Sequence, residues 1–562
     1  MKRLTVFAFL FLSLACRAEP DRSQTSAGPA PRGPVTGDAG APIDSTCRFD
    51  TVADAGQPAV VDAGHGGHHD DAGHPPAHGD EAIDAGLPPA RVTVNVNTSA
   101  RFQTVSGFGA TAVPFENDRF YNSHVSTVPP VVSATPAKRQ ALAKLIFEDL
   151  GMSRARLPYR GIEPTNDNGD AEAFDWTKFV FDYRPTQDAI GSLATGPDHT
   201  AALVKDSIPF GLTTFFPVNS VEWEPDWMHA AAGSPRVAPG MEAEFAEFIA
   251  AAAKRYADLG VEVPYLSIAN EPSFATGLGA SLTPAQLVDV VKYAGRRFRA
   301  LGFSTKLVAP DDFSPANALP YVRALLADTE ARGYLGAIAY HSYDAYVSTR
   351  DMLATSGMGA PPAGPIAARQ EIRDLAATWG LPVWMTESSG SVDGLGRFKS
   401  ALARVNHVHD ELVYANVAAF DQMSHWFLDR PDYEEALATV SFDASGALAT
   451  YAALPIGTAM SQYARYVRPG SVRVAATSTN ARVRASAFVA PGNRLVVVII
   501  NNWSTGISLS LSAPGTLLGG VGERIVTTEQ ISRASTNFAV SSGSNDFCVP
   551  PESITTIVTP LL

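Results

Sequence analysis

Between residues 103 and 426 the chain alternates short apolar stretches of strand character with longer stretches of helical periodicity. Eight strand candidates can be counted, at residues 103–109, 153–157, 209–217, 263–269, 305–309, 337–340, 382–386 and 418–426. The helical stretches between them include residues 136–150, 241–259, 283–301, 365–378 and 398–414. Strands separated by helices pair in parallel, and eight of them close a barrel. We therefore predict an α/β fold, with a (β/α)8 TIM barrel over residues 101–458.

The pattern changes near residue 459 to short stretches rich in Val and Ile, separated by Gly, Ser, Asn and Pro. They lie at residues 471–475, 483–488, 495–501, 507–511, 524–528 and 555–559. Such spacing is typical of an antiparallel β-sandwich, which we assign to residues 459–562. The alternating residues 91–96 predict one more strand, and we expect the segment 91–100 to join this side domain.

The amino terminus reads as an export signal. Lys2 and Arg3 precede an apolar stretch, residues 4–14, which is too short to span a membrane. Ala15-Cys16 then resembles the lipobox of bacterial lipoproteins, in which the cysteine is acylated. Residues 1–16 are therefore predicted to be a signal peptide. The mature protein is either a lipoprotein of the cell envelope, anchored through Cys16, or a secreted protein.

Residues 17–90 are dominated by Ala, Gly, Pro, Asp and Ser, with Asp-Ala-Gly recurring five times. This composition cannot bury a core, so we predict a disordered linker. A tract with five histidines, His65, His68, His69, His74 and His78, lies within it. A solvated tract is favoured over a metal site, because the fixed ligand spacings of structural zinc sites are missing. Outside the cytoplasm Cys47 and Cys548 can form a disulfide, and two free thiols are the alternative.

Composition restricts the partners. With 562 residues the chain exceeds a single core, and 45% apolar with 18% charged residues describes a globular protein. A net charge of −14 argues against nucleic acid and against an anionic membrane surface. We expect a monomer that meets a membrane only through a lipid anchor.

Two glutamates each follow one of the short apolar stretches. Glu271 lies in Asn270-Glu271-Pro272, after the fourth predicted strand, and Glu387 ends the seventh. Both carboxylates are therefore expected at the carboxyl-terminal rim of the barrel, where enzymes with this fold have their active sites. Hydrolysis of a glycosidic bond needs two carboxyl groups in opposite protonation states. The pair predicts a glycosidase that uses neither a cofactor nor a metal.

Further motifs at successive strand ends resemble glycoside hydrolase family 30, and the resemblance covers residues 92–560. They are residues 103–109, 151–156, 220–228 with two tryptophans, Asn270-Glu271-Pro272, His341-Ser342-Tyr343, Glu387, Trp426 and residues 463–474. The resemblance implies a retaining enzyme that cleaves β-glycosidic bonds by double displacement on a barrel with a side β-domain.

Roles follow from this resemblance, with Glu271 as general acid/base and Glu387 as nucleophile. The residues expected to bind substrate are Asn270, Arg156, His341, Tyr343, Trp223, Trp227 and Trp426. The alternatives are a turn residue before proline for Asn270, a rim salt bridge away from the site for Arg156, a packed histidine at position 341 and core packing of each tryptophan. Four other acids near strand ends are expected to be solvated loop carboxylates, namely Glu222, Glu224, Asp311 and Asp312.

The resemblance restricts the substrate. Members that cleave glucosylceramide carry an aspartate where this chain has Pro114, and Ser220-Val221-Glu222-Trp223 departs from the usual Ser-Pro-Trp. We therefore expect a polysaccharide such as xylan or a β-1,6-linked glycan. A glucosylceramidase-like exo-glycosidase and a glycan-binding protein without turnover are the alternatives.

Overall fold

The computed structural model describes residues 91–112, 136–159, 197–219, 226–231, 234–273, 280–344, 363–388, 397–428, 436–443 and 448–562. The predictions for the first 90 residues, which include Cys16, Cys47 and the histidine tract, lie outside this part of the chain. Pro114, Glu222, Trp223 and Glu224 lie outside it as well.

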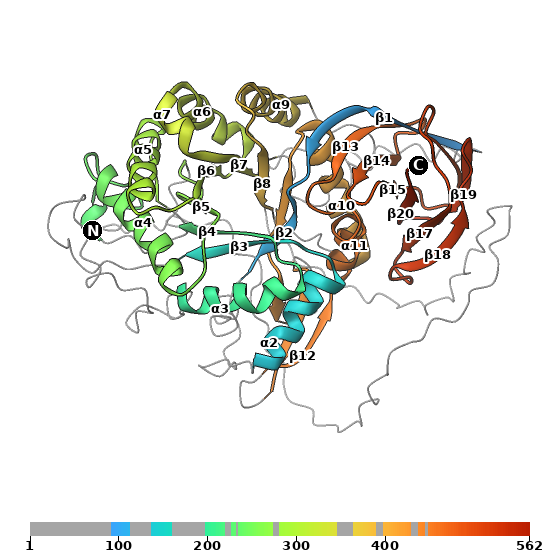
Figure 1. Cartoon of the computed structure of the whole chain (residues 1–562), viewed down its shortest axis with the longest axis horizontal. Coiled ribbons are helices and arrows are strands. Elements are labelled where there is room, and N and C mark those ends of the chain that lie inside the picture. Colours follow the sequence, from blue (N-terminus) through green and yellow to red (C-terminus); the bar gives the residue numbers. More distant parts are fainter. Residues whose placement is uncertain are drawn as a thin grey trace, which may run out of the picture. The chain divides into compact units, whose positions relative to one another are not determined.

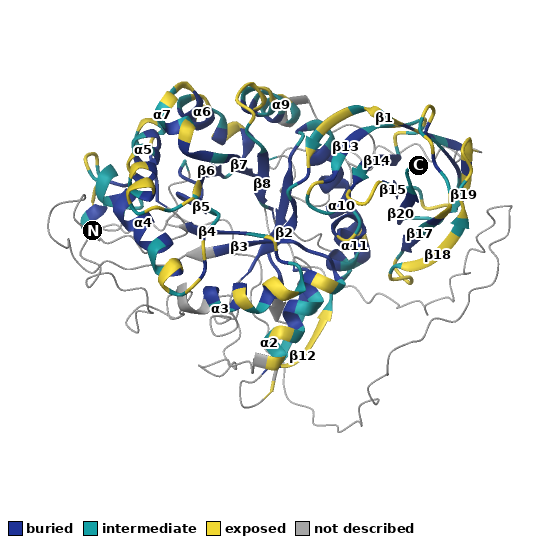
Figure 2. Ribbon diagram, in the orientation of Figure 1, coloured by how far each residue is buried: buried dark blue, intermediate teal, exposed yellow. Residues whose placement is uncertain are grey.

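Eight parallel strands close into a barrel (Figure 1). In chain order they are β2 (Gly107–Thr111), β3 (Arg154–Tyr159), β4 (Thr214–Asn219), β5 (Tyr265–Ser267), β6 (Lys306–Asp312), β7 (Leu335–His341), β8 (Val383–Glu387) and β9 (Ala419–Gln422). Pairing of β2 with β9 completes the closure. The predicted eight-stranded TIM barrel is confirmed. Figure 2 shows these strands as largely buried, as a parallel sheet covered by helices requires.

Helices lie between the strands along the chain. They are α2 (Pro136–Ala143), the π-helix η2 (Lys144–Asp149), α3 (Pro197–Ser207), α4 (Glu242–Asp258), α5 (Pro284–Ala300), α6 (Pro315–Ala327), α7 (Thr329–Tyr334), α9 (Ala363–Thr378) and α10 (Arg397–Tyr414). Short 3₁₀ turns are η3 (Ile208–Phe210) and η4 (Asp226–Met228). The start of α5 follows from the sequence, because Thr283 and Gln286 form a capping box and the proline between them lies in the first turn. The predicted strand 209–217 starts late, since η3 occupies its first residues.

The carboxyl-terminal strands form a nine-stranded sheet together with β1 (Val92–Thr104). Its other strands are β13 (Val472–Ser478), β14 (Val483–Ala490), β15 (Arg494–Asn501), β16 (Ile507–Ser512), β17 (Val521–Thr527), β18 (Ala534–Ala539), β19 (Ser544–Val549) and β20 (Ser553–Pro560). Neighbours pair antiparallel except β1 with β16. Strands β18 and β19 escaped the sequence analysis because their residues are largely polar, and Figure 2 shows β18 largely exposed.

Strand β1 runs further than the sequence indicated. It continues to Thr104, and the barrel begins only at Gly107, so the predicted strand 103–109 is divided between the two domains. Gly107 has φ +126°, and a side chain there would overlap the hydroxyl of Ser153. Glycine is therefore required where the chain passes from the side domain into the barrel.

Two further elements join the barrel to the side domain. A three-stranded sheet of β10 (Trp426–Leu428), β11 (Ala438–Phe442) and β12 (Leu448–Ala453) follows the last barrel strand, and α11 (Pro455–Ala464) follows it. The main apolar core runs from the barrel through α11 to β14, β15, β17 and β20. Among the described residues, no helix is long and apolar enough to cross a membrane.

Candidate active site

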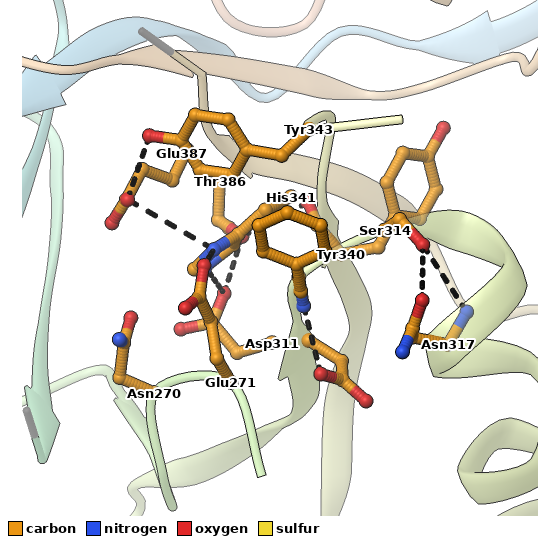
Figure 3. A network of polar contacts seen from close by, with 12 residues as sticks. Asn270, Glu271, Asp311, Ser314, Asn317, Tyr340, His341, Tyr343, Thr386 and Glu387 are labelled. Atoms are coloured by element: carbon orange, nitrogen blue, oxygen red, sulfur yellow. Dashed lines mark hydrogen bonds and ion pairs between the residues drawn. The ribbon is translucent and has the colours of Figure 1, made fainter. Parts of the chain in front are cut away.

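The two glutamates lie at the carboxyl ends of barrel strands, as expected from their positions. Glu271 follows β5, and Glu387 is the last residue of β8. One carboxylate oxygen of each lies within 4.8 Å of the other and of a ring nitrogen of His341. Figure 3 shows the three side chains converging. Glu271 is 5% exposed, and the side chain of Glu387 is 12% exposed, so both carboxylates lie in a largely dehydrated site.

Glu387 is held by two donors. Arg156, on β3, donates from Nη1 to Oε2 at 2.6 Å, and the hydroxyl of Tyr343 donates to Oε1 at 2.9 Å. Both carboxylate oxygens of Glu387 are therefore fixed in direction, one by a cation and the other by a hydroxyl.

Glu271 has a different environment. Its Oε1 lies 2.8 Å from Nδ1 of His341, which comes from the end of β7. Its backbone has φ +51°, and its N–H donates to the carbonyl of Asp311 at 3.0 Å. A residue other than glycine rarely adopts such a φ, and strained residues of this kind cluster at functional sites. The bond to Asp311 fixes the direction in which the chain leaves β5.

Asn270 is joined to the Glu387 side of the site through Arg156. The guanidinium donates from Nη2 to the amide oxygen of Asn270 at 2.6 Å while its Nη1 binds Glu387. One arginine therefore contacts residues from both carboxylate-bearing strand ends. Burial opposes the charge of Arg156, but Glu387, Asp311 and Glu271 outweigh it and raise its pKa.

His341 is fully buried and lies between the two glutamates (Figure 3). Burial by itself would lower the pKa of the imidazole, but Glu387, Asp311 and Glu271 surround the ring and raise that pKa to about 10. Tyr343 lies edge-on to the ring, with centroids 6.1 Å apart. The packed histidine allowed by the sequence analysis is thus a buried residue that also contacts a glutamate.

Asp311 and Asp312 correct the sequence analysis, which expected solvated loop carboxylates. Both lie at the end of β6 and are fully buried. Asp311 bonds to Arg156, Ser267, Thr386 and His341. The Asp312 Oδ1 accepts bonds from Ser273 and from the backbone of Phe313, and burial raises its pKa to about 6. The acids are buried because partners from other strands surround them, which local sequence does not reveal.

The tryptophans are placed differently from the glutamates. Trp426 is 2% exposed and belongs to the main apolar core, so its ring offers almost no surface to a sugar. Trp227 is partly buried against the same core. Of the two alternatives left open for Trp426, core packing describes its surroundings.

A second polar layer lies behind the strand ends, and the sequence analysis missed it. Arg369 of α9 donates to Glu411 of α10 at 2.8 Å and to the hydroxyl of Ser342 at 2.6 Å. The hydroxyl of Tyr340 donates to Glu411 at 2.7 Å, and Ser342 Oγ lies 2.9 Å from a ring nitrogen of His407. Ser342 stands between His341 and Tyr343, so this layer fixes the segment that carries both site residues.

The three side chains of Glu271, His341 and Glu387 are also close enough to surround a metal ion. The charges around them oppose this. The Arg156 guanidinium already binds Glu387 at 2.6 Å, and three carboxylates raise the pKa of His341, which favours a protonated ring over a metal ligand. The donor set suits hydrogen bonding to a polar substrate better than a cation.

Comparison with known proteins agrees with this architecture. Residues 470–557 match the model of the glycosyl hydrolase family 30 beta sandwich domain. The chain is 24% identical over 306 residues to glucuronoxylanase XynC of Bacillus subtilis (strain 168), covering 53% of this chain and 62% of that protein. It therefore spans less than two thirds of this curated relative.

Solved structures share the fold over 83% of this chain. A family 30 endoxylanase from Clostridium papyrosolvens C71 matches over its whole length, with a TM-score of 0.58 and 22% identity. Xylanase C from Talaromyces cellulolyticus matches over 99% of its catalytic domain, with a TM-score of 0.62 and 19% identity. The endo-β1,6-glucanase BT3312 gives 0.57 at 17% identity, over 94% of its length. Residues 470–557 thus match the family 30 β-sandwich model, and the chain shares its fold with solved xylanases.

Proposed function

We propose that this protein is a retaining glycoside hydrolase that cleaves β-glycosidic bonds in a polysaccharide such as xylan or a β-1,6-linked glycan. The observation that carries the proposal is the approach of the Glu271 and Glu387 carboxylates to within 4.8 Å. Retaining enzymes hold their carboxyl groups about 5–5.5 Å apart, whereas inverting enzymes leave about 6.5–9.5 Å for a water molecule. The environments also differ, since Glu387 accepts hydrogen bonds from Arg156 and Tyr343, whereas Glu271 faces the ring of His341.

In the first step Glu271 donates a proton to the glycosidic oxygen while Glu387 attacks the anomeric carbon. The bond to the leaving group breaks, the leaving group departs as an alcohol, and a glycosyl ester forms on Glu387. In the second step Glu271 removes a proton from water, whose oxygen attacks the anomeric carbon and displaces Glu387. Arg156 and Tyr343 hold the nucleophile in line, because both donate to its carboxylate.

Two arguments favour a polysaccharide. XynC of Bacillus subtilis is named a glucuronoxylanase, and solved structures of the same fold include endoxylanases and an endo-β1,6-glucanase. This chain also has Pro114 where glucosylceramide-cleaving members carry an aspartate. We further propose that residues 1–16 direct export and that Cys16 carries a lipid anchor, which would place the enzyme at the surface of the cell envelope.

Hydrolysis of xylan, β-1,6-glucan, β-1,6-galactan and aryl β-glycosides should be measured with the wild type and with Glu387→Gln. We expect the wild type to cleave at least one polysaccharide, with the first product of β configuration by proton NMR, and the variant to lose turnover. Glu371→Gln is the matched control, because this α9 carboxylate pairs with Arg323 on the surface. Full activity in Glu387→Gln would refute the assignment, and binding without turnover by the wild type would favour a glycan-binding protein.

A further inference from the structure

Asp311 is a buried carboxylate with partners on four other barrel strands. It accepts hydrogen bonds from Ser267 of β5 at 2.8 Å, from the hydroxyl of Thr386 on β8, and from Arg156 of β3 at 3.4 Å. Nε2 of His341, on β7, lies 3.4 Å from its Oδ1. Asp311 is fully buried, and although burial opposes its charge, Arg156 and His341 lower its pKa. It is therefore a permanent negative charge beneath the two glutamates.

The backbone of Asp311 also supports the site. It has φ +60°, and its carbonyl accepts the N–H of Glu271, whose φ is +51°. Two residues in the left-handed region are thus joined by one hydrogen bond. Asparagine tolerates this region better than other non-glycine residues and has nearly the shape of aspartate. Replacement of Asp311 by asparagine therefore removes the charge, and the new residue can still adopt the same backbone conformation.

His341 lies among charged and titratable groups from every neighbouring strand end. They are Arg156, Glu271, Asp311, Asp312, Tyr343 and Glu387. Nδ1 lies 2.8 Å from Glu271, while Nε2 lies 3.4 Å from both Asp311 and Arg156. The second nitrogen therefore has two alternatives, because it can donate to the aspartate when protonated or accept from the arginine when neutral. The charge on Asp311 favours donation.

The charges around His341 favour a protonated ring. The carboxylates of Glu271, Asp311, Asp312 and Glu387 outnumber the cationic group Arg156, and a dehydrated site favours the charge on the ring that offsets part of this excess.

We propose that Asp311 is a positioning residue that keeps His341 a doubly donating imidazolium. Nδ1 then donates to one oxygen of Glu271, and Nε2 donates to Asp311. The kinetic consequence rests on the proposed glycosidase function, but the charge state of His341 does not.

The test is nitrogen-15 NMR of the imidazole signals in full-length protein, with the His341 signal assigned from a His341→Gln variant. In the wild type at pH 8 we expect His341 to show the imidazolium signature. In Asp311→Asn its titration midpoint should fall by about 1–3 pH units, since an opposite charge at this distance shifts a pKa by that amount. A neutral ring at pH 8 in the wild type overturns the proposal, and so does an unchanged midpoint in a folded variant.

Ser267→Ala is the matched control, because it removes a neutral donor to Asp311 and keeps the charge. It should leave the His341 midpoint close to that of the wild type, and an equal shift in this variant would contradict an effect of charge. In the kinetic arm, Asp311→Asn should move the basic limb of the kcat/KM profile to lower pH. Absence of hydrolysis by the wild type would refute the proposed function and leave the NMR result standing.

Discussion

At the scale of single residues, the two glutamates of the site have different hydrogen-bond partners. Glu387 is held by Arg156 and Tyr343, whereas Glu271 faces the ring of His341. A nucleophile must be ionised and a general acid must carry a proton, so unequal surroundings are what a double-displacement mechanism requires. Glu271 also has a strained φ angle. Such a conformation persists only where surrounding contacts hold it, and it is common at functional sites.

Glu271→Gln should slow cleavage of polysaccharide by about 10²- to 10⁴-fold, the usual contribution of a general acid. Dinitrophenyl glycosides need no proton on the leaving group, so formation of their glycosyl-enzyme should be much less affected. Stopped-flow measurement of dinitrophenolate release separates the two steps, and added azide should restore turnover and give a β-glycosyl azide. An equal loss on both substrates would remove Glu271 from the role of acid.

At the scale of elements, two helices brace the strand that carries His341. Arg369 of α9 and Glu411 of α10 form a buried pair at 2.8 Å, and both contact Ser342. Burial would raise the pKa of Glu411, but Arg369 dominates and lowers it to about 2. Besides covering the barrel, the two helices hold Ser342, and with it the segment between His341 and Tyr343, through Arg369 and Glu411.

Glu411→Gln should destabilise the fold by about 1.5–3 kcal/mol, the usual contribution of a hydrogen bond to a charged group, because Arg369 loses Glu411 but keeps Asp344. The depressed pKa gives the pH dependence its sign. The contribution of Glu411 is complete above the unfolded pKa near 4.5 and is lost as pH falls through about 2. Urea unfolding between pH 2 and 6 should accordingly show a shallower acid slope in the variant. If the free energy of unfolding depended on pH equally in the variant and the wild type, Glu411 would not be the source of the acid dependence.

At the scale of the whole molecule, barrel and side domain share one interior. The main core includes Phe488 and Ile554 of the side domain. Arg484 of β14 donates to Asp410 of α10, and Asn406 exchanges hydrogen bonds with Asn502 across the same seam. Separation of the two domains would expose apolar surface and break buried polar contacts, so we expect them to unfold as one unit.

A chain that stops at residue 469 should therefore fail to give a soluble barrel, as measured by circular dichroism and gel filtration. Deletion of residues 17–90 is the matched control and should leave hydrolysis intact, since every described site residue lies beyond it. A cooperative, active barrel from the first variant would contradict the shared core.

The sequence by itself determined the local features. Alternation of strands and helices predicts the eight-stranded barrel, Thr283 marks the start of α5, and the positions after β5 and at the end of β8 place Glu271 and Glu387 at one rim. These features depend on residues near one another in the chain, or on the rule that parallel strands end at the same edge.

Tertiary structure decided what depends on distant partners. Asp311 looks like a loop acid in sequence, yet Arg156 and Thr386, 155 and 75 positions away, enclose its carboxylate. Trp426 looks like a sugar platform and lies in the core. Burial and charge state are set by the side chains that surround a residue, and for these residues the surroundings come from strands far apart in the sequence. The burial and charge of Asp311 and His341 were therefore beyond what sequence alone could specify.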